Sequence, residues 1–294
     1  GAMKVLKEEG SAKGIRQKIA RASSIALALT AASVLGCSPL VELQPGALAG
    51  GSISAEQEAR GLELLKEVTA ASGGIGVWRA FEVGCFEQTA DWHGVANAKR
   101  GWKVDPQPFR LSTPLGTEDG TLDILEGPCA PGRWQRRGDG ITQLREPSGK
   151  CDADTLDYKV VYKAYWFQFP FRIVEAPIVA YGGDVDVEGI TYHTVFATWG
   201  SAEANRDYDQ FVLYIHPETH HIEWLEFTAR EVAAALHMTA HFSDFETTQG
   251  ITLPKVQAVS SGKPGGNGLR MHTNTYHTTA FGVEACAALM DPEG

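Results

Sequence analysis

The sequence of 294 residues has no excess of positive charge. It contains 26 lysines and arginines against 36 aspartates and glutamates, a formal net charge of −10 at pH 7. Proteins that bind nucleic acid need clustered Lys and Arg side chains to neutralise phosphates, so we expect no nucleic-acid partner. The same balance argues against electrostatic docking to anionic lipid headgroups.

Cysteine is scarce as well, with five residues in the chain, and no two have the CxxC spacing of a zinc ribbon or a thioredoxin-type site. Cys85, Cys129, Cys151 and Cys286 allow up to two disulfides by three possible pairings, and disulfides are typical of exported proteins. We favour a Cys129–Cys151 bridge, which would close a loop rich in proline and glycine.

Familiar catalytic motifs are also missing. The sequence contains no HExxH, no GxSxG around Ser201 and no phosphate-binding loop in SSGKPGGNG. Catalytic groups can converge from distant positions, so this absence is weak evidence, but no residue stands out as a nucleophile. We therefore expect a protein that is not an enzyme and that uses no cofactor.

A hydrophobic run long enough to span a membrane is absent near the amino terminus. SIALALTAASVLG is shorter than the roughly 20 apolar residues that a membrane-spanning helix requires. It follows six basic residues and leads directly into Cys37, which is the layout of a secretory signal. A buried helix with an incidental cysteine is the alternative.

The ending VLGC resembles the lipobox of bacterial lipoproteins, in which the signal is removed and the cysteine is acylated. The resemblance implies that Cys37 is the lipid attachment site. Ser38 follows where an aspartate would favour retention in the inner membrane. The resemblance therefore implies a lipid anchor in the outer membrane that faces the periplasm.

Composition divides the chain into three parts. Residues 1–36 contain Gly1 and Ala2, typical of a protease-cleavage scar, followed by the signal peptide. Residues 37–53 hold the acylated cysteine and many Pro, Gly and small residues, so we expect a flexible tether. We expect residues 54–294 to form one domain with a polar insertion near 105–157.

One helix and several strands can be predicted in this domain. Ser54 and Gln57 have capping-box spacing, so a helix should begin at Ser54 and end at the glycine pair 73–74. Strand character begins at Val77, and prolines at 170 and 177 exclude a continuous helix through 158–181. Six closely spaced runs then predict an antiparallel sheet: TYHTVFATW, YDQFVLYI, HIEWLEF, LHMTAHFSDF, ITLPKVQAV and RMHTNTYHTTAF.

The histidines invite a metal site but are better explained by strands and a turn. His216-Pro217-Glu218-Thr219 fits a type I turn between two strand-like runs, so we expect a hairpin tip. His237 and His241 are four residues apart, and we expect them on a strand that begins near Leu236. On a strand they are separated by about 13 Å and cannot share an ion. A metal-dependent hydrolase is the less favoured alternative, with the candidate ligands His216, His220, His221, His237 and His241.

Residues 158–259 resemble exported bacterial proteins of the LolA/LolB-like superfamily of outer-membrane lipoprotein carriers and receptors. The resemblance lies in YWFQFPFRI, DYDQFVLYIHPETHHI and HFSDFETTQGITLPKVQAV, where a strand–Pro–x–Thr–strand hairpin precedes a second hairpin. The matched positions are Pro217, Thr219, Phe242, Asp244, Phe245, Gly250, Ile251, Leu253 and Pro254. The resemblance implies an α+β, mainly β fold: a curved antiparallel sheet, an incomplete β-barrel, wrapped around one or more helices.

In the carriers of this superfamily the concave face is apolar and holds acyl chains. Such a face needs large inward-facing apolar side chains. The candidate ligand-binding residues are Trp166, Phe167, Phe169, Phe171, Trp199, Phe211, Trp224, Phe227 and Phe242, each of which could instead fill a core. We expect a periplasmic binding protein for a hydrophobic ligand or acyl chain. An envelope lipoprotein that holds a protein partner through a sheet edge or aromatic patch is the alternative.

Overall fold

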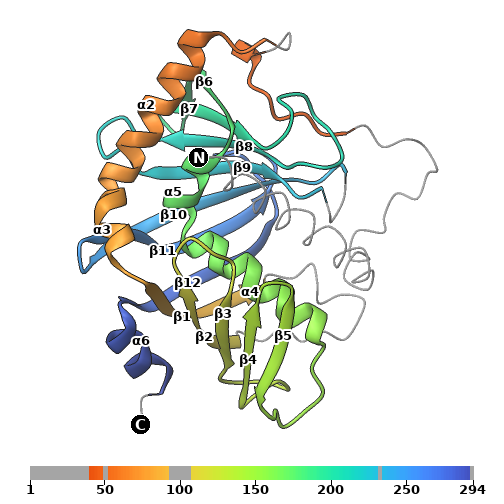
Figure 1. The fold of residues 1–294 in the computed structure, drawn as a ribbon. Coiled ribbons are helices and arrows are strands. Elements are labelled where there is room, and N and C mark those ends of the chain that lie inside the picture. Colours follow the sequence, from red (N-terminus) through yellow and green to blue (C-terminus); the bar gives the residue numbers. More distant parts are fainter. Residues whose placement is uncertain (1–39, 49–51, 93–106, 231–233, 292–294) are drawn as a thin grey trace, which may run out of the picture.

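The computed structural model describes residues 40–48, 52–92, 107–230 and 234–291. Within these ranges the fold is α+β and mainly β, as predicted, with one curved antiparallel sheet of 12 strands and helices on both of its faces (Figure 1). No helix in the described ranges is both long enough and apolar enough to cross a membrane. The predicted attachment site Cys37 lies outside the described residues.

The sheet consists of two meanders that meet where β1 pairs with β12. Its strand order is β5-β4-β3-β2-β1-β12-β11-β10-β9-β8-β7-β6, and β5 and β6 form its edges. The strands are β1 (Val83–Trp92), β2 (Gln107–Pro114), β3 (Gly120–Ile124), β4 (Gly132–Arg137), β5 (Gly140–Arg145), β6 (Ile178–Val187), β7 (Ile190–Thr198), β8 (Gln210–Ile215), β9 (Ile222–Thr228), β10 (His237–Thr248), β11 (Ile251–Ser261) and β12 (Arg270–Phe281). The six strands predicted after residue 190 are all confirmed.

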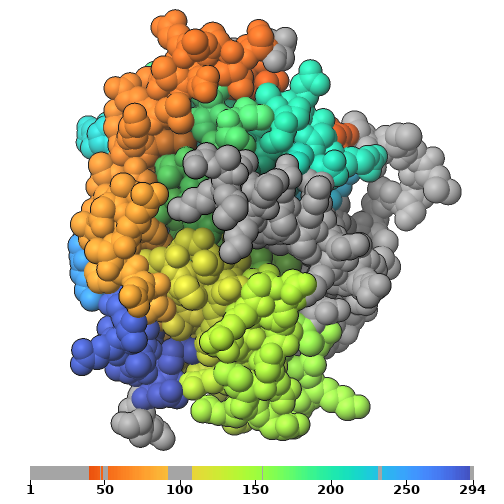
Figure 2. Space-filling view, in the orientation of Figure 1, coloured from red at the N-terminus to blue at the C-terminus, as the bar shows by residue number. Residues whose placement is uncertain are grey.

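The helices lie at the ends and on the faces of this sheet. They are η1 (Gly46–Leu48), α2 (Ala55–Ala71), α3 (Ile75–Ala80), α4 (Ala153–Phe167), α5 (Phe169–Arg172), η2 (Ile173–Glu175) and α6 (Val283–Met290). In the space-filling view α2 (orange) and α6 (blue) lie along one side of the molecule (Figure 2). Helix α4 crosses the opposite face of the sheet from α6, because α4 packs on Leu111 and Leu122 while α6 covers the alternate residues Ser112 and Thr121.

The predicted helix start at Ser54 is confirmed. The Ser54 hydroxyl accepts a hydrogen bond from the Gln57 backbone N–H at 3.1 Å, and the Gln57 side chain accepts one from the Ser54 N–H at 2.9 Å. These two bonds satisfy N–H groups that an α-helix leaves without intrahelical partners. The strand predicted from Val77 is wrong in its first residues, since Ile75–Ala80 is helical, Trp78 is buried, and β1 begins at Val83.

Proline breaks the apolar segment 158–181 as predicted. Helix α4 ends at Phe167, and Pro170 lies in the first turn of α5, where its missing N–H has no intrahelical partner to lose. Strand β6 begins one residue after Pro177. The segment therefore crosses the concave face as two helices at different angles and then returns to the sheet.

The region near 105–157, expected as a polar insertion, takes part in the sheet and its core. Its described part supplies four strands, β2 to β5, and with them one wing of the sheet. Phe109, Leu111 and Leu122 from this wing are fully buried. The strands are short and separated by turns rich in glycine, proline and aspartate, so their alternation was hidden by the turn residues.

The amino-terminal residues 40–48 pack against the sheet rather than forming a free tether. Leu43 and Leu48 are buried beside Phe196 and Val212 on the convex face. The Leu43 N–H also donates to the Gln210 side-chain oxygen at 2.9 Å. Burial of two leucines and a buried hydrogen bond hold this part of the predicted tether in place.

Two disulfides join distant parts of the chain. The predicted Cys129–Cys151 bridge is present, and Cys85–Cys286 is the second, with a sequence separation of 201 residues. The latter fixes α6 to β1. Paired cysteines of this kind are typical of proteins that fold in an oxidising compartment, in agreement with an exported protein.

Candidate functional site

Six of the nine predicted ligand-binding residues meet on the concave face. Trp166 and Phe169 extend from the α4–α5 segment towards rings of the sheet. The Trp166 ring lies 5.3 Å from that of Phe227 and 6.0 Å from that of Phe242. The Phe169 ring lies 6.4 Å from that of Phe211. We call this group the aromatic cluster: Trp166, Phe169, Trp199, Phe211, Phe227 and Phe242. Strand alternation explains it, because every second residue of β8 and β9 faces the helices.

The other three predicted residues lie elsewhere. Phe167 and Phe171 belong to a second buried cluster, where the Phe171 ring stacks on Trp78 at 4.2 Å. Trp224 points to the convex face and stacks on His241 at 4.0 Å, while its neighbour Leu225 faces the aromatic cluster. Counting aromatic residues without strand register could not separate these faces.

The aromatic cluster is closed in this structure. Phe169, Phe227 and Phe242 are 2–3% exposed, and Trp199 is half-buried at the edge of the cluster. Ring separations of 5.3–6.4 Å between helix and sheet mean that the helix side chains contact the sheet side chains directly. An apolar ligand could occupy this space only if the α4–α5 segment moved away from the sheet.

A buried polar strip lies next to the aromatic cluster on the same helix. Lys163 is 6% exposed, and its Nζ donates to the Asn274 Oδ1 at 2.7 Å. Lys159, one turn earlier, places its Nζ 4.5 Å from the centre of the Phe109 ring, which lies 5.7 Å from the Lys163 Nζ. Both ammonium groups are thus directed at the sheet instead of at solvent.

Neither lysine forms an ion pair with a carboxylate within the described ranges. Burial lowers the pKa of Lys159 to about 8. Burial lowers the pKa of Lys163 well below its usual value, and the nearby Lys159 lowers it further. Two cationic side chains are therefore held in a place that disfavours their charged form.

The sheet opposite these lysines is unusually polar for a protein interior. Gln88 is fully buried, and Tyr276 is its cross-strand neighbour. The Tyr276 hydroxyl lies against the side-chain amides of Gln88 and Gln257, and burial raises the pKa of this phenol. We call the group Lys159, Lys163, Gln88, Asn274 and Tyr276 the buried polar strip.

Gln168 attaches the α4–α5 junction to the β2–β3 turn. Its amide nitrogen donates to the Thr117 carbonyl at 2.8 Å, and its amide oxygen accepts from the Gly116 N–H at 2.6 Å. Arg172, further along, pairs with Glu118 of the same turn at 3.0 Å. The segment therefore has one polar anchor at its kink, while Lys163 supplies a second contact to β12.

The histidines form no common site. The predicted hairpin tip is confirmed, with His216 accepting backbone N–H bonds from Glu218 and Thr219. His220 pairs with Glu67 at 3.2 Å, and His237 with Glu226 at 2.7 Å. In the part of the chain that the structure describes, no three His, Cys, Asp or Glu side chains are placed to hold one metal ion.

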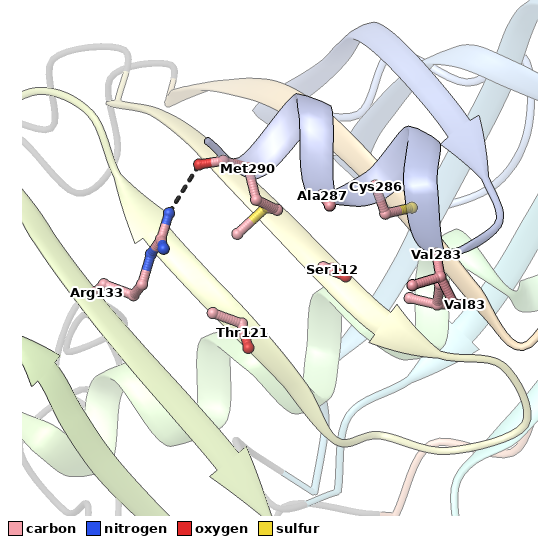
Figure 3. Close-up of a pocket in the computed structure, with 8 residues that line it drawn as sticks. All are labelled: Val83, Ser112, Thr121, Arg133, Val283, Cys286, Ala287 and Met290. Atoms are coloured by element: carbon pink, nitrogen blue, oxygen red, sulfur yellow. Dashed lines mark hydrogen bonds between the residues drawn. The ribbon is translucent and has the colours of Figure 1, made fainter. Parts of the chain in front are cut away.

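A groove of about 270 Å³ lies under α6, on the convex side of β1 to β3 (Figure 3). Arg133 lines it, but its guanidinium is already engaged by Asp123 at 2.6 Å, Asp291 at 2.8 Å and the Met290 carbonyl at 2.7 Å. Through these partners Arg133 holds the carboxyl-terminal end of α6 against the sheet. The groove offers a ligand few free polar groups.

Sequence reasoning missed Lys159 and Lys163. A signal was present, since both lysines interrupt the most apolar segment of the domain and are spaced by four residues. On a helix that spacing places two side chains on one face. Asn274 and Gln88 could not be found in this way, because polar residues on a strand look alike whichever face they occupy.

Comparisons with known proteins find similarity at the level of fold. No protein-family model matches the chain, and no curated protein does. Similar structures are a DUF1329 family protein from Desulfovibrio piger (11% identity, TM-score 0.47, covering 77% of this chain and 94% of that one) and an outer membrane lipoprotein-sorting protein domain from Vibrio parahaemolyticus (13%, 0.46, 76% and 93%). A LolA superfamily protein from Nitrosomonas europaea is similar too (11%, 0.45, 76% and 92%). At 11–13% identity these likenesses concern the fold alone.

Proposed function

We propose that this protein is an exported, lipid-anchored binding protein that accepts a hydrophobic ligand or acyl chain on its concave face and catalyses no covalent chemistry. The observation that carries the proposal is the aromatic cluster, whose rings come in part from a helical segment and in part from the sheet. The helical segment could move away from the sheet without unfolding the sheet itself. The rings of the sheet would then line an apolar trough.

The free energies involved allow a ligand chain to replace the contact between helix and sheet. Exposing four large apolar side chains costs roughly 1.5–3 kcal/mol each, or about 6–12 kcal/mol together. An acyl chain that buries about 12 methylene groups contributes about 10 kcal/mol at roughly 0.8 kcal/mol per group. A ligand chain of this length would therefore offset the loss of helix–sheet contact.

Lipid extraction of protein purified from a native envelope, followed by mass spectrometry, tests for a bound ligand. Binding of the neutral fluorescent probe N-phenyl-1-naphthylamine then locates it. We expect Trp166→Leu, in the aromatic cluster, to weaken probe binding, and Trp78→Leu, in the second cluster, to leave it unchanged. No extractable lipid together with equal probe binding by both variants would refute the proposal.

The lipid anchor is a separate part of the proposal. We expect Cys37 to carry acyl chains, which intact-mass spectrometry of the membrane-extracted protein would detect as an added mass on the amino-terminal peptide. The variant Cys37→Ala should appear in the soluble periplasmic fraction. Membrane fractionation of that variant identical to the wild type would contradict an anchor at this residue.

A second function is favoured by one edge of the sheet. Among the described strands β5 pairs with β4 alone, its residues are largely exposed, and Leu144 is 52% exposed. An edge of this kind can add a strand from another polypeptide. Cross-linking in the native envelope tests this role, because a protein partner held at β5 should be recovered in constant proportion and lost on Thr142→Pro.

A further inference from the structure

We propose that the buried polar strip binds the anionic head group of an amphiphile, a carboxylate or phosphate ester, whose apolar chain lies along the aromatic cluster. The inference rests on the proposed binding function and names the chemical class of its ligand. It is carried by Lys163 and Lys159, which lie on one face of α4 and are directed at the sheet, where Asn274 and other polar side chains are buried.

The charge balance of the strip points to an anion. Transfer of an ammonium group from water to a protein interior costs several kcal/mol unless an opposite charge compensates it. Across the described ranges Lys163 has a neutral amide as its hydrogen-bond partner, and Lys159 has the face of an aromatic ring. An oxyanion placed between them would supply the opposite charge that residues 40–48, 52–92, 107–230 and 234–291 do not provide. A cationic head group would be repelled by the same two side chains.

The hydrogen-bonding groups of the strip match an oxyanion with two or three oxygens. Both lysine nitrogens lie near the same Phe109 ring, at 4.5 and 5.7 Å from its centre, so we place the acceptor group between them. The Gln88 amide and the Tyr276 hydroxyl lie against each other on neighbouring strands in register, so both can turn to donate to an oxyanion placed beside them. Charge-assisted hydrogen bonds from such donors are the strong ones.

The head-group site and the chain site are continuous. Lys163 and Trp166 are three residues apart on α4, so they are neighbours on the helix surface within about one turn of 5.4 Å. A ligand whose head lies at the strip would have its chain directed at Trp166 and Phe169. The same outward movement of the α4–α5 segment would open both parts.

The test compares two fluorescent probes that differ only at the head: cis-parinaric acid and the corresponding alcohol. We expect the wild type to bind the acid about tenfold more tightly than the alcohol, the effect of one favourable charge contact. Lys163→Met and Lys159→Met should each abolish most of this preference by weakening binding of the acid more than that of the alcohol. Lys66→Met, which removes an exposed lysine from α2, is the matched control and should behave as the wild type.

Folding and head-group chemistry are controlled in the same experiment. Thermal unfolding followed by circular dichroism identifies variants that fail to fold, and Lys159→Arg, which keeps the charge, should keep the preference for the acid. Displacement of the acid by dodecanoate or by dodecyl phosphate distinguishes carboxylate from phosphate heads. Acetate and inorganic phosphate should displace it poorly, because they have no chain.

The outcomes separate this inference from the proposed function. Equal affinity of the wild type for acid and alcohol, or an unchanged preference in both lysine variants, would overturn the anionic head group while leaving a hydrophobic ligand in place. Binding of neither probe by the folded wild type would refute the binding function, and the head-group site with it. Preference for the acid that is lost in Lys163→Met supports both.

Discussion

The half-buried Lys159 makes the stability of the fold depend on pH in an unusual direction. Its pKa is lowered to about 8 by burial, whereas an unfolded lysine titrates near pH 10.4. Between these values the unfolded chain binds more protons than the folded one, so the free energy of unfolding should rise with pH. Below about pH 8 both states are protonated and the destabilising effect is present in full.

The size of this effect follows from the two pKa values. Raising the pH from about 7.5 to about 9.5 should add at most about 2 kcal/mol through Lys159, less whatever solvent access the half-buried side chain retains. Lys163, whose pKa is also lowered, acts in the same direction. The net charge becomes more negative over the same range and opposes the gain, so the comparison must be with a variant that lacks the group.

Urea unfolding followed by tryptophan fluorescence measures the effect. We expect the free energy of unfolding of the wild type to increase over this range relative to that of Lys159→Met, which should be more stable than the wild type near neutral pH. The exposed-lysine variant Lys66→Met should follow the wild type. Parallel pH profiles for the wild type and Lys159→Met would refute the argument that burial lowers the pKa of Lys159.

Three further predictions concern stability. Replacing Cys129 and Cys151 by serine opens a loop with a separation of 22 residues and should cost about 3 kcal/mol by chain entropy, measured by urea unfolding. Gly73→Ala should destabilise by more than about 1 kcal/mol, because φ is +109° and the new Cβ would lie 2.1 Å from a backbone oxygen; Gly76→Ala, with open space around it, should not. Trp78→Ala, which removes a buried ring stacked on α5, should cost about 3–5 kcal/mol, and a loss below about 1 kcal/mol would contradict its place in the second cluster.

Elements with a strong local signal could be predicted from the sequence. Three such signals are the capping box at Ser54, the prolines at 170 and 177 and the turn at His216. Each depends on the backbone conformation of a few consecutive residues, so a short stretch of sequence is enough to predict it. The strands β2 to β5 were missed because each is short and its alternation is interrupted by turn residues. They are held by pairing with neighbours in the sheet, which no local window contains.

In the candidate site, too, some side chains could be predicted from the sequence and others could not. The residues of the aromatic cluster were predicted as a class, because a large ring is expected to be buried wherever it lies. Which face each ring occupies depends on strand register, and this is why Trp224 was assigned to the wrong side of the sheet relative to its neighbour Leu225. The buried lysines went unnoticed because charged residues are expected at the surface unless they are paired.

The helices differ in how firmly they are attached to the sheet and in how much unfavourable burial of charge they carry. Helix α6 is held by a disulfide, and α2 packs so closely on β6 that a Cβ at Gly61 would come within 3.0 Å of backbone atoms. Helix α4 instead presents to the sheet two ammonium groups that have no carboxylate partner in the part of the chain that the structure describes. The unfavourable free energy of burial is therefore concentrated at the interface that a ligand would have to open, and an anionic head group would remove that cost on binding. Hydrogen exchange should accordingly be faster along α4 than along α2 in the ligand-free protein, and cis-parinaric acid should slow it at α4; equal protection of the two helices in both states would mean that α4 is not the moving element.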